Sequence, residues 1–430
     1  MRKMRDSGNM WIGATPETWK MIPLKYLASY NDEVLSENTD DEFEFDYIEI
    51  GSVQYGRGII YTEHMKFKNA PSRARRIVRK DDIIVSTVRT YLKAVATIPA
   101  CNNSLIASTG FIVIRPHKVL PRFMNYALLS ESFISLVESH STGISYPAIN
   151  SVDVVKFKIP VPCRSEQERI AAFLDAECAE IDAVLEKTRA SIEEYKKLKQ
   201  AVITQAVTKG IREDRPMKDS GIEWIGEIPE EWDCKKVKYV TSISRGIFNH
   251  RPRNDERCYG GEYPFIQTGD VAGAQKYIES YSQTLNELGK SVSKCFPKGT
   301  LTMTIAANVG DAAILGFDAF FPDSVVGFIP NADINDEYLY YIFKAMKPEF
   351  VRTAIKSTQF NLNVERIRDL FVPVVVQKSE QLEIAEYLNT KCADIDALIA
   401  KKQQYLTEIE NYKKSLIYEY VTGKKEVHPL

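Results

Sequence analysis

Basic side chains gather in two well-separated stretches of the sequence. The first stretch holds Arg73, Arg75, Arg76, Arg79 and Lys80, and the second holds Arg245, Arg251 and Arg253, with the amide of Asn249 among them. Arginine and lysine neutralise phosphates, and an arginine also donates two parallel hydrogen bonds to the edge of guanine. The same residues suit an ordinary solvated charged loop equally well. The basic runs therefore leave both interpretations open.

Further polar side chains fall in predicted loops. Arg89 and Lys93 lie in the turn between two predicted strands, a common place for binding residues. Asparagine and glutamine amides pair with adenine, but they also cap turns and helices. The candidate nucleic-acid contacts of the first region are Arg73, Arg75, Arg76, Arg89, Lys93, Ser145 and Tyr146. Those of the second region are Arg245, Asn249, Arg251, Arg253, Asn308, Gln359, Asn361 and Asn363.

The sequence lacks the motifs of the catalysts that act on DNA. No methyltransferase Asn-Pro-Pro or Asp-Pro-Pro motif occurs, and Gly289-Lys290-Ser291 lacks the earlier glycine of a phosphate-binding loop. Glu194-Tyr195-Lys196 has no upstream Pro-Asp and is typical of helix surface charge. The five histidines and seven cysteines are dispersed without metal-ligand spacing. We therefore expect no catalytic residue, no metal site and no cofactor in this chain.

Composition predicts a soluble protein of two or three domains. The chain has 430 residues, a net charge of −2 and an apolar fraction of 44%. Any surface that binds nucleic acid must therefore be locally basic. No run of 18 apolar residues is present, and the N-terminus lacks the apolar core of a signal peptide. A cytoplasmic location without membrane contact is expected.

Two long amphipathic helices position these regions. One is predicted from Ser165-Glu166-Gln167 to about Lys209, and the other from Ser379-Glu380-Gln381 to about Gly423. Apolar residues recur at alternating steps of four and three, as in a coiled coil, and an offset of 214 superposes the two patterns. The predicted pairing seam comprises Leu174, Ile181, Leu185, Ile192, Tyr195, Leu388, Ile395, Ile399, Leu406 and Ile409. The alternative is two unrelated helices, each packed on its own domain.

A second repeat precedes each globular region. Asp6-Ser7-Gly8, Trp11-Ile12-Gly13 and Trp19 return as Asp219-Ser220-Gly221, Trp224-Ile225-Gly226 and Trp232, at an offset of 213. The tryptophans are interpreted as packing anchors, with base stacking as the alternative. The chain is thus a tandem duplication of entry segment, globular region and long helix.

Each globular region is predicted to be mixed. In the first, strands are expected at 47–50, 82–87, 94–98, 111–114 and 155–161, with a helix at 121–139. In the second, strands are expected at 265–267, 301–304, 312–315, 325–329 and 371–373, with a helix at 337–355. The predicted fold class is therefore α/β (α+β), with two globular domains alternating with two long paired helices. The predicted boundaries are 1–158, 159–212, 213–371 and 372–430.

These motifs together resemble the specificity subunit of type I restriction–modification enzymes. The resemblance rests on the Trp-Ile-Gly entry motif, the Ser-Glu-Gln helix opening, Ile181-Asp182 with Ile395-Asp396, and the helix end Ala206-Val207-Thr208-Lys209-Gly210. It covers essentially the whole chain. One departure is the second helix end, Tyr420-Val421-Thr422-Gly423-Lys424, which leaves only local contacts in doubt.

The resemblance implies the function and the partners. Each globular region would be a target recognition domain that reads one half of a bipartite double-stranded DNA sequence. The helices would pair antiparallel, as a spacer and a platform for two methyltransferase subunits, and motor–nuclease subunits would join them. S-adenosylmethionine, ATP and Mg²⁺ would bind to those partner subunits. The competing hypothesis is a coiled-coil adaptor that binds two protein partners without DNA.

Overall fold

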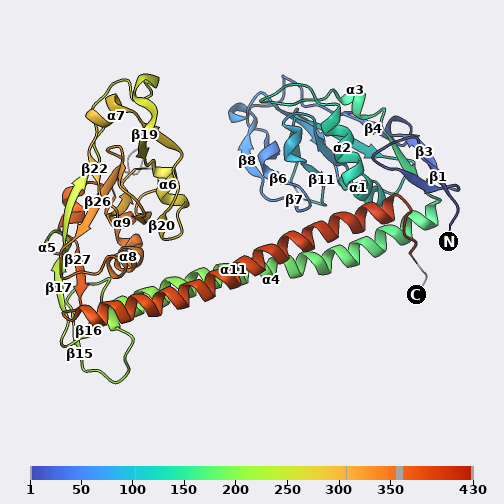
Figure 1. Cartoon of the computed structure of the whole chain (residues 1–430). Helices are drawn as coiled ribbons and strands as arrows, with labels where there is room; N and C mark the ends of the chain where they lie inside the picture. The colour runs from blue at the N-terminus through green and yellow to red at the C-terminus, as the bar shows by residue number, and fades with distance from the viewer. Residues whose placement is uncertain (1, 102, 307, 355–361, 428–430) are drawn as a thin grey trace. The chain divides into compact units, whose positions relative to one another are not determined.

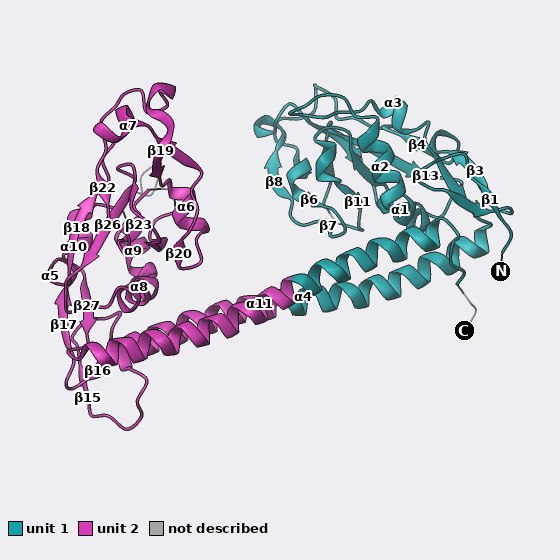
Figure 2. Cartoon of the chain, in the orientation of Figure 1, with its two compact units in different colours: residues 1–189, 404–430 teal, residues 190–403 magenta. Residues whose placement is uncertain are grey.

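The computed structural model describes residues 2–101, 103–306, 308–354 and 362–427. It divides into two compact units, shown in different colours in Figure 2. Unit 1 comprises residues 1–189 and 404–430, and unit 2 comprises residues 190–403. Each unit contains one globular region and a segment of each long helix.

The two long helices begin and end where the sequence pattern predicts. Helix α4 runs from Arg164 to Lys209 and α11 from Lys378 to Val421. Each is followed within two residues by a glycine with positive φ, Gly210 at +76° and Gly423 at +73°. Glycine adopts this left-handed conformation without a steric penalty and commonly ends helices. The repeated Gly after each helix is therefore a stop signal.

Within each unit, α4 and α11 pack side by side and run antiparallel (Figure 1). In unit 1, Asp182 pairs with Lys413 while Arg189, seven residues later, pairs with Glu410, so residue numbers rise on one helix as they fall on the other. In unit 2, Lys199 pairs with Asp396. All ten predicted seam residues are buried or half-buried. The prediction of paired antiparallel helices is confirmed.

The globular part of unit 1 holds two four-stranded sheets with helices against one of them. The first sheet has the order β11 (Val95–Thr97), β10 (Ile83–Ser86), β13 (Phe111–Pro116), β4 (Ala28–Tyr30). The second has the order β8 (Glu63–Lys66), β5 (Glu44–Ile48), β12 (Leu105–Ser108), β9 (Ala74–Val78). Helices α1 (Pro121–Leu129) and α2 (Glu131–Ser139) share a core with the first sheet. The inner strand β10 is apolar and buried on both faces.

Unit 2 repeats this plan. One sheet has the order β18 (Thr241–Arg245), β26 (Val325–Pro330), β23 (Leu301–Thr304), β24 (Ala312–Leu315), β20 (Tyr277–Ile278). The other has the order β21 (Gln283–Leu285), β19 (Tyr259–Phe265), β25 (Ala319–Phe320), β22 (Cys295–Phe296). Helices α8 (Asp336–Ala345) and α9 (Lys347–Thr353) correspond to α1 and α2. The predicted mixed fold of two repeated globular regions is confirmed.

The entry segments form matching small hairpins and strands. β1 (Met4–Asp6) pairs with β2 (Ala14–Pro16), and β15 (Met217–Asp219) pairs with β16 (Glu227–Pro229). β3 (Lys20–Pro23) pairs with β14 (Lys158–Val161), and β17 (Asp233–Lys236) pairs with β27 (Phe371–Val374). Trp19 and Trp232 are each 1% exposed, whereas Trp11 is exposed. The first two are packing anchors, as expected.

Several element predictions were wrong. The predicted helix 121–139 is broken at Ser130, which is extended, and the predicted helix 337–355 is broken after Ala345. The predicted strand 155–161 begins only at Lys158, after the short helix α3 (Ser151–Val154). The predicted strand 47–50 ends at Ile48 in β5, and the strand at 265–267 ends at Phe265 in β19. In the basic run, Arg75 and Arg76 lie in β9, whereas Arg73, Arg79 and Lys80 lie in the turns that flank it.

Candidate nucleic-acid interface

The repeated Ser-Glu-Gln opening fastens each long helix to its globular region. Gln167 Nε2 donates to Pro162 O at 3.0 Å, and its Oε1 accepts from Leu120 N at 2.8 Å. Gln381 repeats this, donating to Val375 O at 2.9 Å and accepting from Asn335 N at 2.8 Å. Leu120 and Asn335 are the residues that precede α1 and α8. The glutamines therefore fix the starts of α1 and α8 against the long helices.

The preceding glutamates bind an arginine of each entry segment. Glu166 pairs with Arg2 at 2.5 Å and accepts from Trp19 Nε1 at 3.0 Å. Glu380 pairs with Arg215, whose guanidinium also lies over the Trp232 ring. Both glutamates are largely buried at these contacts. The entry segment of each repeat is thereby held on the start of the long helix.

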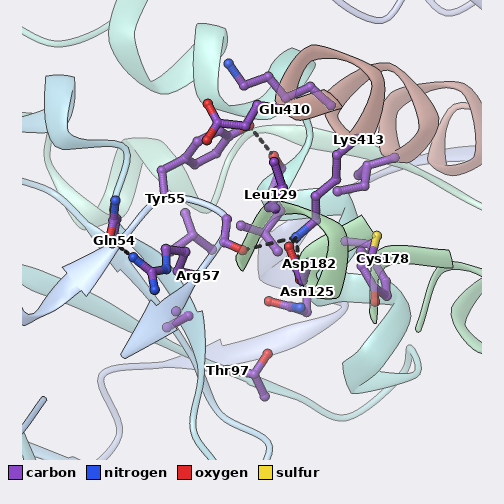
Figure 3. Close-up of a pocket in the computed structure, with 18 of the residues that line it drawn as sticks. Gln54, Tyr55, Arg57, Thr97, Asn125, Leu129, Cys178, Asp182, Glu410 and Lys413 are labelled. Atoms are coloured by element: carbon purple, nitrogen blue, oxygen red, sulfur yellow. Dashed lines mark hydrogen bonds and ion pairs between the residues drawn. The ribbon is translucent and has the colours of Figure 1, made fainter. Parts of the chain in front are cut away.

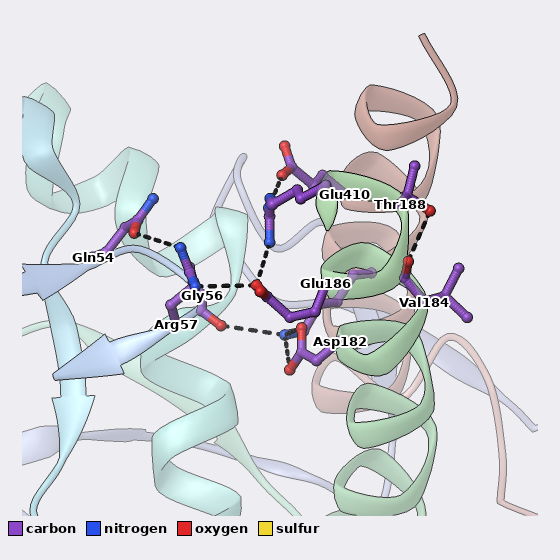
Figure 4. A network of polar contacts seen from close by, with 10 residues as sticks. Gln54, Gly56, Arg57, Asp182, Val184, Glu186, Thr188 and Glu410 are labelled. Carbon is purple, nitrogen blue, oxygen red and sulfur yellow. Dashed lines mark hydrogen bonds and ion pairs between the residues drawn. The ribbon is translucent and has the colours of Figure 1, made fainter. Parts of the chain in front are cut away.

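In unit 1 an additional hairpin contacts the helix pair. Strands β6 (Val53–Gln54) and β7 (Gly58–Ile59) present Gly56 and Arg57 to the helices (Figure 4). Lys413 Nζ donates to Gly56 O at 3.2 Å and to both oxygens of Asp182 at 2.7 and 2.8 Å. Arg57 bonds to Glu186 at 3.0 Å.

A cleft of about 590 Å³ lies between this hairpin, β11, α1 and the helix pair (Figure 3). Tyr55 closes one wall by donating to Leu129 O at 2.9 Å. Lys413 and Asp182 fill another wall with their mutual ion pair. These polar groups already bind one another, so the cleft serves to hold the globular region on the helices.

The predicted arginines of the first region lie on and beside β9. Arg75 lies over the Phe67 ring at 5.0 Å, and Arg79 is paired with Glu33 at 2.7 Å. Arg76 is half-buried, its buried Nε has no hydrogen-bond partner among the described residues, and burial lowers the pKa of its guanidinium. A cation in this state gains much from an incoming anion. Arg76 is therefore the strongest phosphate-binding candidate of the run.

Two loops of unit 1 that are distant in sequence lie against each other. We call residues 88–93 and 141–148 the loop pair. Thr90 Oγ1 donates to Ser141 Oγ at 2.9 Å, and Thr90 N donates to Pro147 O at 3.4 Å. Val88 and Thr142 each form a bridge to Ala148. The structure thus brings Arg89 and Tyr146 together, with the guanidinium 5.4 Å from the ring centre.

Of the other predicted contacts of unit 1, Lys93 and Ser145 belong to the loop pair, and Arg73 lies close to it. Lys93 is 3.4 Å from Glu138, and Ser145 is exposed in the second loop. Arg73 O accepts from Thr109 N, while the neighbouring Gly110 O accepts from Thr87 N at the edge of the loop pair. Arg73 is exposed and has no ion-pair partner among the described residues. One surface of unit 1 therefore gathers cations, hydroxyls and an aromatic ring.

In unit 2 the predicted basic loop begins one residue later than expected, because Arg245 is the last residue of β18. Asp323 binds two of the predicted arginines. Arg253 pairs with Asp323 at 2.6 Å, and Arg245 Nε donates to Asp323 O. Arg251 donates to Phe248 O and His250 O at 2.8 Å. The side chain of Asn249 is exposed. These arginines are pre-positioned by hydrogen bonds, and Arg245 and Arg251 have no carboxylate partner among the described residues.

The predicted amides of unit 2 fall in different surroundings. Asn308 is exposed in the turn between β23 and β24. Asn363 accepts from Glu365 N at 3.0 Å and caps α10 (Val364–Arg368), the structural role that the sequence left open. Gln359 and Asn361 lie outside the described residues. The candidate contacts among the described residues of unit 2 are therefore Asn308 and the basic loop.

Sequence reasoning missed the cross-helix ion pairs. Adding 214 to Asp182 and to Lys199 gives Asp396 and Lys413, so the pairs Asp182–Lys413 and Lys199–Asp396 are copies of one contact. The signal was present, because both aspartates lie in the repeated Ile-Asp motif. The sequence pattern did not show which lysine of the opposite helix each aspartate would face.

No cluster of three or more metal-ligating side chains occurs within the described ranges. Over those ranges, no helix is long and apolar enough to cross a membrane.

A protein-family model described as the type I restriction modification DNA specificity domain matches residues 16–194 and again residues 229–410. The chain belongs to this family. The two matches reproduce the tandem repeat and include the surfaces described above and most of each paired helix. The resemblance drawn from the entry and helix motifs is confirmed, and the chain is a DNA specificity subunit rather than an enzyme or a DNA-independent adaptor.

Known specificity subunits are similar along their whole length. The MjaVIII specificity subunit of Methanocaldococcus jannaschii is 25% identical over 435 residues, covering 96% of this chain and 95% of the relative. A putative MjaX specificity subunit from the same organism is 23% identical over 432 residues, covering 97% and 96%. One solved structure was described as the basis of complex assembly and conformational transition in the type I restriction–modification system. A chain of that structure superposes on this chain with a TM-score of 0.73. That chain is 22% identical, and the match covers 96% of this chain and 99% of the other. This last match bears on the fold.

Proposed function

We propose that this specificity subunit reads a bipartite double-stranded DNA target, with the globular region of each unit reading one half. The recognition domains are assigned to residues 1–158 and 213–371, and the helical segments 159–212 and 372–430 form the spacer between them. The observation that carries the proposal is a repeated scaffold with unlike loops. The Gln167 and Gln381 fastenings are the same in both units, whereas the loop pair of unit 1 has a different composition from the basic loop and turn of unit 2.

Two reading heads joined by a helical spacer would suit a split target with an unread gap. The duplicated ion pairs Asp182–Lys413 and Lys199–Asp396 fix the register of α4 against α11 in each unit. A tandem repeat supplies two heads of one fold, and dimeric DNA readers likewise use two copies of one fold for two half-sites. Phosphate contacts from the arginines would position each head, and base-edge contacts would specify the sequence.

The partner subunits supply the chemistry. Two methyltransferase subunits and motor–nuclease subunits are proposed to assemble on the helix pair. S-adenosylmethionine, ATP and Mg²⁺ are assigned to those subunits, and this chain contributes DNA binding and placement.

The deciding experiment is the methylome of cells that co-express this chain with its cognate methyltransferase subunit. A new two-part methylated motif with a fixed unread gap is expected. Exchanging residues 213–371 for those of a relative should change one half-motif and leave the other intact. A demonstrably active complex that marks only a short continuous motif would overturn the two-head model.

The spacer role has its own test. A four-residue insertion next to Ala201 adds about 6 Å of helix to α4 and should change the gap length but neither half-motif. The matched control is the same insertion after Glu37, which is exposed in a turn of unit 1. An unchanged gap in the Ala201 variant would count against the spacer.

A further inference from the structure

The tip of the loop pair in unit 1 exposes apolar side chains. Ile144 is fully exposed, Tyr146 is 67% exposed and Tyr91 is 53% exposed. Single exposed apolar residues are common on protein surfaces. Here they stand together on two loops that are bound to each other, beside the cation of Arg89. This grouping suits a partner that is both apolar and anionic.

The backbone of the tip is built to hold these side chains outward. Gly143 has φ +106°, and a Cβ at this position would lie 3.1 Å from Tyr146 O. Only glycine lets the chain fold back so closely, which leaves residues 144 and 145 at the outer end of the turn. The pairing of Thr142 with Ala148, by two hydrogen bonds of 2.9 Å, closes the base of the turn.

The facing loop is strained and well supported. Arg89 and Lys93 both adopt φ +51°, a left-handed conformation that non-glycine residues rarely take. Such strain persists only where the surroundings enforce it, and it is concentrated at binding sites. The Thr90 contacts to Ser141 and Pro147 enforce it here. One consequence is that Arg89 is placed over the ring of Tyr146.

Stacked bases match this surface. DNA-binding proteins insert apolar side chains between base pairs and kink the duplex, while neighbouring cations bind the phosphates. An aromatic ring with an arginine on one face offers its other face to a base. A protein partner would satisfy the apolar side chains, but it gives no reason for unpaired Arg73 and half-buried Arg76 on the same region.

We infer that Ile144 and Tyr146 form a wedge that enters the base stack of the half-site read by unit 1. Arg89 supports the wedge by holding the ring of Tyr146 and by neutralising the nearest phosphate. The inference rests on the proposed function, because it requires that unit 1 reads DNA.

The wedge predicts how part of the sequence is read. Unstacking costs least at pyrimidine–purine steps such as TA and CA, so a wedge selects a flexible step without touching its base edges. The half-site assigned to unit 1 should therefore contain or adjoin such a step. Replacing it with a stiff step should weaken binding even though no hydrogen bond to a base is lost.

The test uses the full chain in complex with its cognate methyltransferase subunits, on duplexes that carry the motif found in the methylome. The fluorescent base 2-aminopurine is placed at successive positions of the half-site assigned to unit 1. Unstacking brightens this base. The methyltransferase will also brighten its own flipped target base, because such enzymes extrude the base they modify. That second signal serves as an internal reference.

Wild type should brighten one step besides the methylation target. The double variant Ile144→Ala with Tyr146→Ala should lose this signal, keep the target-base signal and bind between about fivefold and a hundredfold more weakly. Ile144→Leu should retain the step signal. Ile60→Ala is the matched control, because Ile60 is 49% exposed in the same unit but lies outside the loop pair, and it should behave as wild type.

The outcomes separate the two proposals. If the complex binds its two-part motif but no step besides the target brightens, or the signal survives in the double variant, the wedge is wrong and the proposed function stands. If the double variant instead loses its methyltransferase subunits, the tip is a protein contact and the wedge is overturned. If no two-part motif is bound at all, both proposals fail.

Discussion

The turn that follows β10 in unit 1 is built differently from the corresponding turn after β23 in unit 2. In unit 1 the turn after β10 exposes Tyr91 and holds Arg89 over Tyr146. In unit 2 the corresponding turn after β23 buries Val309 in the core and exposes the amide of Asn308. An apolar and cationic surface therefore stands where its repeat presents a hydrogen-bonding group.

The scaffold beneath these turns is nearly the same. The hydroxyl of Tyr126 in α1 donates to Asp175 of α4 at 2.7 Å, and the hydroxyl of Tyr341 in α8 donates to Asn389 of α11 at 2.7 Å. Asp175 and Asn389 are related by the offset of 214. The anchors on the long helices thus repeat in the two units, whereas the turns above them differ.

The largest expected effect concerns the two buried tryptophans. Trp19→Ala and Trp232→Ala should each cost about 3–5 kcal/mol, because each removes a fully buried ring. The two sites should differ for Trp→Phe, since Trp19 Nε1 donates to Glu166 whereas Trp232 Nε1 has no partner among the described residues. Trp19→Phe should lower the free energy of unfolding by about 1 kcal/mol more than Trp232→Phe does. Hydrogen exchange of the buried amides measures the stability of each unit in these variants. Equal losses of stability in Trp19→Phe and Trp232→Phe would mean that the hydrogen bond to Glu166 contributes nothing.

The next effect distinguishes the cationic turn from the amide turn. Arg89→Ala should weaken binding on all sequences and reduce the salt slope by about one. Asn308→Ala should relax one base of the other half-site by about 1–3 kcal/mol and leave the salt slope unchanged. Competition binding by the assembled complex at several salt concentrations measures both. If Arg89→Ala instead relaxed a single base at constant salt slope, the assignment of the two turns would be reversed.

The long helices were predictable because their signal is local and repeated. The four-and-three spacing and the glycines at 210 and 423 place both helix ends within two residues. Strands β23 and β24 were also predicted with their observed bounds, since each is a short apolar run between turn residues.

The helix breaks were missed although one had a clear signal. Pro348 has no N–H to donate to Lys344 O, and that carbonyl accepts instead from Gln200 Nε2 at 3.2 Å. Pro348 should have ended the predicted helix. At Ser130 the apolar pattern continues across the break, and the hydroxyl that satisfies Ala127 O is visible only in the fold.

The loop pair was only half predictable. Both loops were named as candidates, because each combined polar residues with turn signals. Their contact through Thr90 and Ser141, 51 residues apart, depends on tertiary packing that no local pattern encodes. The full exposure of Ile144 was equally hidden, since an isoleucine is expected inside the protein.

A smaller effect separates the duplicated ion pairs. Lys413 is 12% exposed and binds Asp182 and Gly56 O, whereas Lys199 is 29% exposed and, among the described residues, binds Asp396 alone. Lys413→Met should therefore cost about 1–2 kcal/mol, and Lys199→Met less than about 1 kcal/mol. Hydrogen exchange along α4 in the two variants provides the comparison. Equal losses of stability in the two variants would mean that the hydrogen bond from Lys413 to Gly56 O does not stabilise the helix pair of unit 1.

The smallest expected effect is the pH dependence that Glu337 gives to the stability of unit 2. Burial alone would raise the pKa of Glu337, but hydrogen bonds from Asn389, Lys276 and Tyr277 outweigh it and lower that pKa. The carboxylate therefore stabilises unit 2 above its unfolded pKa near 4.5, and the contribution is lost as pH falls through the lower folded value. Glu337→Gln should cost about 1 kcal/mol at pH 7.

The difference between Glu337→Gln and wild type should shrink as urea titrations are repeated at lower pH, below about 4.5. Glu386→Gln is the matched control, because Glu386 is exposed on α11 and its side chain has no partner among the described residues. This control should show no such convergence. If the difference in the free energy of unfolding between Glu337→Gln and wild type stayed constant with pH, the cost of the substitution would come from altered packing and not from the lost charge. The charge of Glu337 would then play no part in holding α8 on α11.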